Sequence, residues 1–352
     1  GRKIHAEVVK FTPISSSTFC GTCHDVTLLN GFRLEEAFSE YRSGPAAAKG
    51  ITCQDCHMGK IQGIPSGYHE GPAAVVGGVP TKPRKLTNHI MAGPDYSLVH
   101  PGIFPHNAEA QQLATLAEWL TYDYKAGWGT DKFEDNIPAG TTFPKAWESI
   151  DARYDAREIL NYQFGRLAEV RELRLEVLRN GYLLSDVKVN EATTSGIEIQ
   201  AKVSNITEGH NTPTGFTGER LVWVWVTVTD ASGKVVFQSG DTDANGDVRD
   251  HESAFVHAGQ IPLDTQLFSL QSRFLVQSVR GGERERTVTI PYSTTALPFL
   301  RPTRLSLILT GESTVERNHR KGIEPLGHRI ATYEIDSHLL TGKGTYNAKV
   351  EL

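Results

Sequence analysis

The chain has 352 residues, of which 39% are hydrophobic and 22% charged, and its net charge is −5. This composition is typical of a folded chain long enough for two domains and excludes a disordered or fibrous protein. The acidic charge, without a long basic run, argues against nucleic acid as a partner. The longest apolar run, Leu221 to Val228, is too short to span a bilayer, and no signal-peptide core follows the initial Gly-Arg-Lys. We therefore expect a soluble chain whose export signal has been removed.

The first 106 residues are rich in Gly, Pro and His and show little periodicity, apart from a helical stretch at Leu34 to Tyr41. Such a segment cannot build a core from its own side chains. Apolar residues then recur at helical spacing from about Ala108 to Tyr124 and from Lys145 to Arg179. Asn180-Gly181 is expected to cap the second of these helices.

From residue 181 the hydrophobic period changes to two, which predicts short strands separated by turns. The expected strands are Val187–Ala192, Ile197–Val203, Leu221–Thr229, Lys234–Gln238, Arg286–Pro291, Arg304–Thr310 and Arg329–Ile335. Asp230-Ala-Ser-Gly233 is a plausible hairpin turn. We predict an α+β fold in which a loop-rich, helical domain over residues 1–180 precedes a β-sandwich (immunoglobulin-like) domain over residues 181–352.

The chain has four cysteines, and all of them lie in two C-x-x-C pairs that are each followed directly by histidine. The two sets are Cys20, Cys23 and His24, and Cys53, Cys56 and His57. C-x-x-C-H is the attachment signature of haem c, in which two thiols add across the vinyl groups and the histidine reaches the iron. The spacing therefore predicts two covalently attached haem c groups, with the two histidines as proximal iron ligands. These haems would supply the apolar bulk that the first 106 residues lack.

Two other uses of the cysteines have to be weighed. A disulfide would leave both histidines unexplained, and a zinc site of C-x2-C-x29-C-x2-C type would use four sulfurs and ignore the histidines. With 13 histidines in 352 positions, chance would place one after both pairs in roughly one such sequence in 700. The spacing thus favours haem over zinc.

The second axial ligand of each iron has several candidates among the remaining histidines. In falling order of preference they are His89, His210, His100, His69, His106 and His5. For most of these residues a hydrogen-bonded loop histidine is an equally good interpretation. Met58 and Met91 are the sulfur alternatives, of which Met58 follows its own proximal histidine and is expected to point elsewhere.

These motifs resemble those of bacterial multihaem cytochromes c that have a haem-bearing N-terminal region and a C-terminal β domain. The resemblance runs through residues 15–24 and 50–58, the His89 segment, and the loop from Gly209 to Gly215 with Arg220 and Trp223 after it. It implies a dihaem cytochrome c domain with low-spin, bis-histidine haems and a periplasmic, outer-membrane or extracellular location.

Family members commonly carry more than two haems, so the resemblance also implies that this chain is one section of a longer electron path. The partners would then be redox proteins or other multihaem cytochromes, in a homo-oligomer or a larger complex. The strand-like end from Tyr346 to Leu352 fits truncation or pairing with a neighbour.

Three functions are compatible with this sequence. The leading hypothesis is an electron carrier without chemistry at iron. The second is a haem-containing reductase of a small nitrogen or sulfur oxyanion, in which one iron keeps an open position. The third is a structural subunit whose β domain docks the haem module in a cytochrome assembly.

A separate motif lies in the strand-rich half. Its residues Asp241, Asp243, Asn245, Asp247 and Glu252 match most of the oxygen positions of a twelve-residue calcium loop, with Gly246 at position six. A strand is expected before it and no typical helix after it, so a solvated turn rich in Asp, Asn and Gly is the competing interpretation. If calcium is bound, it would be structural.

Overall fold

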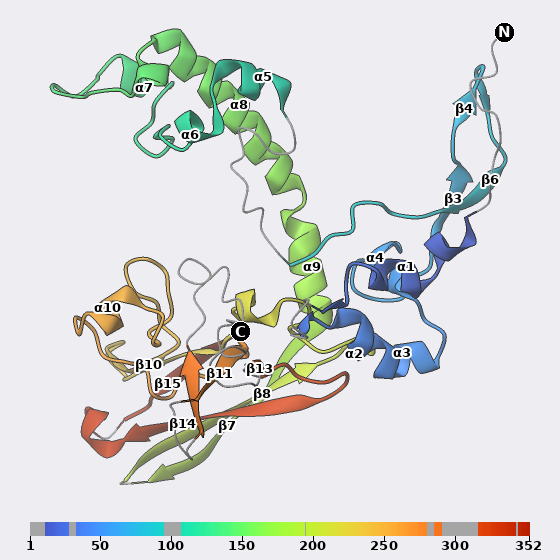
Figure 1. The fold of residues 1–352 in the computed structure, drawn as a ribbon. Coiled ribbons are helices and arrows are strands. Elements are labelled where there is room, and N and C mark those ends of the chain that lie inside the picture. The colour runs from blue at the N-terminus through green and yellow to red at the C-terminus, as the bar shows by residue number, and fades with distance from the viewer. Residues whose placement is uncertain are drawn as a thin grey trace. The chain divides into compact units, whose positions relative to one another are not determined.

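The structure, a computed structural model, describes residues 11–27, 33–94, 107–193, 195–279, 285–290, 316–342 and 344–352 (Figure 1). The chain divides into two compact units, one formed by Gly1–His89 with Arg179–Leu352 and the other by Ile90–Leu178. The predicted boundary at residue 180 marks the change from helix to strand. The compact units have different boundaries from the predicted domains, because the cysteine-bearing segment contacts the strand-rich half and belongs to the same unit.

The cysteine-bearing segment consists of short elements joined by loops. Its helices are η1 (Thr12–Ser15), α1 (Ser17–Gly21), α2 (Ala37–Ser43), α3 (Pro45–Ala48) and α4 (Cys53–His57). Its strands are β1 (Val26–Thr27), β2 (Arg33–Glu35), β3 (His69–Pro72), β4 (Val75–Val76), β5 (Val79–Pro80) and β6 (Pro83–Leu86). Strands β1 with β2, β3 with β6 and β4 with β5 form two-stranded antiparallel pairs. The helix predicted at Leu34 to Tyr41 begins only at Ala37, since the preceding residues pair as β2.

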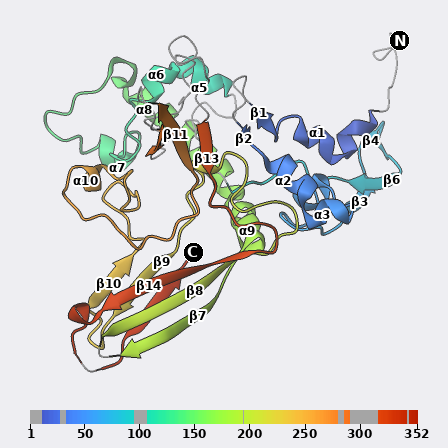
Figure 2. The ribbon, with the colours of Figure 1, turned by 60° about the horizontal axis from the view of Figure 1, so that its bottom comes forward.

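The described residues of the strand-rich half form three three-stranded sheets, ordered β14-β8-β7, β10-β9-β15 and β12-β11-β13 (Figures 1 and 2). Their strands are β7 (Tyr182–Thr193), β8 (Gly196–Asn205), β9 (Trp225–Thr229), β10 (Val235–Ser239), β11 (Arg273–Val279), β12 (Glu285–Ile290), β13 (Glu316–His319), β14 (His328–Asp336) and β15 (Asn347–Glu351). Short helices lie between them: η3 (Thr217–Glu219), α10 (Ala254–His257) and η4 (Ser337–Leu339). The terminal strand β15 pairs with β9 of the same chain. The predicted strand Arg304–Thr310 lies outside the described residues.

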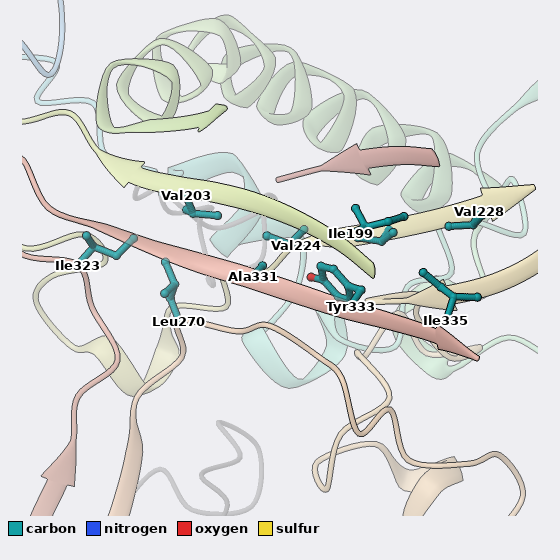
Figure 3. Packing of buried hydrophobic residues seen from close by; sticks show 10 residues of the cluster. Ile199, Val203, Val224, Val228, Leu270, Ile323, Ala331, Tyr333 and Ile335 are labelled. Atoms are coloured by element: carbon teal, nitrogen blue, oxygen red, sulfur yellow. The ribbon is translucent and has the colours of Figure 1, made fainter. Parts of the chain in front are cut away.

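One apolar core joins two of these sheets, because alternate residues of β8, β9 and β14 point inward (Figure 3). In β14 the alternation is regular, with Ala331, Tyr333 and Ile335 buried and the residues between them exposed. Ile199 of β8 and Val226 of β9 belong to the same cluster. The predicted β-sandwich with immunoglobulin-like topology stays a prediction.

Tyr333 is the polar exception in this core. Its ring lies among the labelled apolar side chains of Figure 3, and among the described residues its buried hydroxyl has no hydrogen-bond partner. An unsatisfied buried hydroxyl is costly, so we expect Tyr333→Phe to leave the free energy of unfolding unchanged or to raise it by up to about 1 kcal/mol. Urea unfolding of the two proteins measures the difference.

Tyr122→Phe is the matched control for this substitution. The buried Tyr122 hydroxyl lies 2.8 Å from the carbonyl oxygens of Trp128 and of Arg153. Its removal should lower the free energy of unfolding by about 0.5–1.5 kcal/mol, because the hydrogen bonding of this buried hydroxyl is lost while the Trp128 carbonyl keeps the Arg157 guanidinium as a donor. A comparable loss in Tyr333→Phe would show that the Tyr333 hydroxyl has a partner after all.

The second unit, Ile90–Leu178, is helical. Its elements are α5 (Ala108–Leu113), α6 (Leu116–Trp119), α7 (Asp131–Glu134), η2 (Lys145–Trp147) and α8 (Ile150–Glu169), and α9 (Arg171–Gly181) continues into the other unit. Its core is aromatic, with Trp119 and Trp147 fully buried and their ring centroids 5.2 Å apart. No helix among the described ranges is long and apolar enough to cross a membrane.

Candidate haem-binding sites

Both C-x-x-C-H motifs are built on single turns of helix. Cys20 lies on α1, and the His24 amide donates to the Cys20 carbonyl at 2.9 Å, which continues the helical turn through the motif. The second motif is α4 itself. A capping box starts α4, because the Thr52 hydroxyl accepts the Asp55 amide and the Asp55 carboxylate accepts the Thr52 amide. Each motif therefore presents its two thiols and its histidine from one short helical turn.

Hydrogen bonds join the two motif segments directly. The Cys53 amide donates to the Ser17 hydroxyl at 3.1 Å, and the Ser17 hydroxyl donates to the Tyr41 hydroxyl at 3.0 Å. The Tyr41 hydroxyl in turn donates to the Ile51 carbonyl at 2.8 Å. The buried Gln54 side chain binds two carbonyls of the segment before α1. The two attachment sites are thus held beside each other by a connected polar network.

All four cysteines are free thiols. Burial and the neighbouring Cys53 raise the pKa of the Cys20 thiol, and burial together with the Asp55 carboxylate raises the pKa of the Cys56 thiol to about 11. Across the part of the chain that the structure describes, which includes all four cysteines, no three His, Cys, Asp or Glu side chains converge as a metal site. A zinc site with cysteine ligands alone requires four thiolates around one ion. This arrangement does not provide one.

His24 is anchored by a carboxylate. Its Nδ1 lies 2.9 Å from Oε1 of Glu35, at the end of β2, so Nδ1–H donates to the carboxylate. That hydrogen bond fixes the tautomer and leaves Nε2 of His24 with its lone pair. An imidazole prepared in this way is suited to bind a metal ion through Nε2.

His57 faces His210, which comes from a loop of the strand-rich half. The two ring centroids are 6.2 Å apart and the ring planes are within 3° of parallel. With a metal–nitrogen bond of about 2.0 Å and about 1.2 Å from that nitrogen to the ring centre, two imidazoles on opposite sides of one ion have centroids about 6.4 Å apart. The observed separation therefore fits two axial ligands of one iron.

The protonation states of this pair also suit metal binding. Burial, followed by the charges of His210 and His24, lowers the pKa of His57 to about 4, so its imidazole is neutral near pH 7. The Nδ1 of His210 lies 2.8 Å from the carbonyl oxygen of Asn211 and donates to it. Nε2 of His210 is thereby left as the free acceptor.

The loop that carries His210 is fastened to α3. The Ala46 amide donates to the Glu208 carbonyl at 3.0 Å, and Lys49 Nζ lies 2.5 Å from the Glu208 carboxylate. From the strand-rich side, the Asn205 side-chain amide donates to the His210 carbonyl at 2.9 Å. The loop is therefore held at both the haem-motif side and the β side.

A buried carboxylate, Glu40 on α2, provides a second fastening. It accepts the Thr214 hydroxyl at 2.5 Å and pairs with Arg320, which also binds Glu36. Its side chain is 8% exposed, and burial raises its pKa, although its hydrogen bond to Thr214 opposes the shift. Glu40 thus ties the segment between the two motifs to the loop that presents His210.

Tyr68 and Lys85 support α4 from the hairpin that follows it. The Tyr68 hydroxyl donates to the Asp55 carboxylate at 2.7 Å, and Lys85 Nζ lies 3.4 Å from the Tyr68 ring centroid. Burial, with the hydrogen bond to Asp55, raises the pKa of Tyr68. These contacts hold the carboxylate that caps the second haem-attachment helix.

The cysteine-bearing segment has almost no apolar core of its own. Among its described residues, 11–27 and 33–89, Ala46 is the only buried apolar residue. Phe11, Ile14 and Phe19 instead expose 60%, 54% and 45% of their surface around the first motif. Exposed apolar side chains in a segment that carries four free thiols fit the binding of a porphyrin, which would supply the missing interior.

The other predicted axial candidates are placed as follows. His69 and His89 are exposed, and Nε2 of His89 lies 3.1 Å from the Thr87 hydroxyl. His5, His100 and His106 lie outside the described residues. Met58 caps α4, and Met91 is 59% exposed. The sequence ranked His89 first, whereas the structure brings His210 to a proximal histidine.

Two carboxylates of the candidate calcium loop are bound by donors of the protein itself. Asp241 is bound by the Arg249 guanidinium through two hydrogen bonds of 2.6 and 2.8 Å. Asp243 accepts the amides of Asn245 and Asp247 and the Ser253 hydroxyl. No metal-binding group of three acidic, His or Cys side chains occurs in the described parts of the chain. The calcium prediction, which also includes Glu252, stays a prediction. Asp241 and Asp243 are hydrogen-bonded within the protein, whereas burial and the nearby Asp243 and Asp250 carboxylates raise the pKa of Asp247.

Sequence reasoning missed Glu35 and Glu40. No local signal marks either residue, because their partners His24 and Thr214 lie in other segments. Thr52-x-x-Asp55 is different, since the capping-box pattern is recognisable in the sequence directly before the second C-x-x-C-H motif, where no helix was predicted.

Neither a protein-family model nor a curated protein matches the chain. Among solved structures, a penta-heme cytochrome c552 from Thermochromatium tepidum is similar, with a TM-score of 0.38 and 15% sequence identity. The match covers 96% of this chain and 48% of that one, so this chain spans about half the length of the cytochrome. A likeness of this degree decides neither fold nor function, which we infer from the residues.

Proposed function

We propose that the chain is a c-type cytochrome that binds two covalent haems and carries electrons between redox partners. The observation that supports it most is the opposition of His57 and His210 at 6.2 Å beside a C-x-x-C pair. When bound, haem c supplies an iron that alternates between ferrous and ferric states. The rest of the activity depends on how this chain's residues hold and enclose the two groups.

The residues at the second motif are arranged to hold a haem rather than to bind a substrate at its iron. Cys53 and Cys56 offer thiols for attachment, and the imidazoles of His57 and His210 lie parallel with their centroids 6.2 Å apart. If His57 and His210 both hold the iron, the protein would leave no open position there for a substrate. This favours electron transfer over the reductase hypothesis for the site that contains His57.

The polar network between the motifs keeps the two sites close. Ser17, on α1, receives the Cys53 amide and so links the first attachment helix directly to the second. Attachment points that share a hydrogen bond favour rapid exchange of an electron between the two haems. A chain with two adjacent carriers suits a relay between partner proteins.

The location and partners belong to the same proposal. We propose that the protein works in the periplasm or outside the cell, as the resemblance to multihaem cytochromes implies. Its partners would be redox proteins or other multihaem cytochromes, and the chain would act as one section of a longer path.

Intact mass and a pyridine haemochrome spectrum test the core of this proposal. We expect two covalent haems per chain, and one in the Cys53→Ser/Cys56→Ser variant. Visible spectra should be low-spin in both oxidation states for the haem held by His57 and His210. A mass without haem would refute the proposal, and carbon monoxide binding to that haem without denaturation would favour the reductase.

A further inference from the structure

The structure anchors the histidines of the two sites on acceptors of different charge. Nδ1 of His24 donates to the Glu35 carboxylate at 2.9 Å, whereas Nδ1 of His210 donates to the neutral Asn211 carbonyl at 2.8 Å. Both hydrogen bonds leave Nε2 free for a metal. The first site therefore has an anion behind its ligand, and the second has a peptide dipole behind His210.

The carboxylates around Glu35 are matched by cations. Asp25 binds Arg33 at 2.6 Å, and Glu36 binds both Arg33 and Arg320. Glu35 binds the His24 imidazole, and its side chain is 22% exposed. It acts on the ligand of the first site through a direct hydrogen bond.

Gly215 lies beside the Glu35 carboxylate. It adopts a φ of +73°, and a Cβ at this position would lie 3.4 Å from Oε1 of Glu35 and 3.9 Å from Nη2 of Arg220. The turn thus passes close to the carboxylate, with a guanidinium nearby. The Arg220 guanidinium offsets part of the negative charge of Glu35. The effect of Glu35 on the reduction potential must therefore come from its hydrogen bond to His24 more than from the net charge around the site.

An anionic acceptor makes an imidazole ligand more basic, which stabilises the more positive, ferric state of the iron and lowers the reduction potential. A neutral carbonyl acceptor makes the imidazole less basic than a carboxylate does, and so lowers the reduction potential less. Solvent acts in the same direction, since the His24 side chain is 64% exposed whereas His57 is partly buried. Burial disfavours the extra charge of ferric iron and raises the potential.

We propose that Glu35 is a positioning residue that makes the haem of His24 the lower-potential site, so that an electron entering the chain comes to rest at the haem held by His57 and His210. This polarity rests on the proposed function. It gives the relay a direction, from the first motif to the second.

Spectroscopic redox titration of the native protein and Glu35→Gln tests the polarity. We expect the lower-potential transition to move to higher potential in the variant and the other transition to stay in place. His210→Ala identifies the transition of the second site, because it changes the ligand there. Glu35→Asp keeps the charge but shortens the side chain, so it should shift the same transition in the same direction even if Glu35→Gln fails to fold.

Asp25→Asn is the matched control. It removes the same charge next to His24, but Asp25 bonds Arg33 and Ser39 rather than the imidazole, so its shift should be smaller. Equal shifts in Asp25→Asn and Glu35→Gln would overturn the role of the hydrogen bond. A lower-potential transition that responds to His210→Ala would reverse the polarity. Fewer than two covalent haems in the native protein would instead refute the proposed function.

Discussion

Replacing His210 by alanine should convert one of the two haems from low-spin to high-spin and leave the other unchanged. The His210 ring lies parallel to that of His57 at a centroid separation that fits axial ligation of one iron. Without the imidazole, that iron keeps one strong protein ligand, and a position opens to water or carbon monoxide. Electron paramagnetic resonance and visible spectra of the ferric protein, with carbon monoxide added to the ferrous protein, measure the conversion.

Two further alanine variants complete this test. His338→Ala removes an exposed histidine of η4, whose side chain is 72% exposed, and should leave both haems low-spin. His89→Ala removes the candidate that the sequence ranked first. If His89→Ala creates the high-spin haem and His210→Ala does not, the assignment of His210 is wrong.

The second large effect is expected in the helical unit, where Glu134→Gln should lower the free energy of unfolding by about 3–5 kcal/mol. Glu134 and Arg153 form an ion pair whose side chains are only 1% and 3% exposed. Arg153 also donates to two carbonyl oxygens and lies 3.9 Å from the Phe143 ring centroid. The substitution leaves this guanidinium buried without its counter-charge, and that is the costly state.

Urea unfolding followed by near-ultraviolet circular dichroism measures the loss, because this unit has an aromatic core. Glu169→Gln is the control, since it removes an exposed carboxylate paired with Arg166 and should change stability by less than about 0.5 kcal/mol. Glu134→Leu combined with Arg153→Met should be less destabilised than Glu134→Gln. Equal effects of Glu134→Gln and Glu169→Gln would contradict the importance of the buried pair.

Regular strands were predictable from the sequence, while helix breaks were not. Ile197–Val203 and Arg329–Ile335 correspond to β8 and β14, because one buried face imposes a period of two. The expected helix from Ala108 to Tyr124 is instead α5 and α6, separated where Thr115 caps α6 with Glu118. The capping box was present in the sequence, but the apolar periodicity continues across it and hides the break.

The two C-x-x-C-H motifs separate the features that local sequence predicts from those that depend on the tertiary structure. The sequence alone predicts thiols and a histidine on one helical turn, because five consecutive residues contain all of that chemistry. The opposition of His210 to His57, the anchoring of His24 on Glu35 and the tie between Glu40 and Thr214 were decided only by the tertiary structure. These partners come from segments far apart in the chain, and sequence spacing carries no information about which of many loop histidines and carboxylates the fold brings to a given ring.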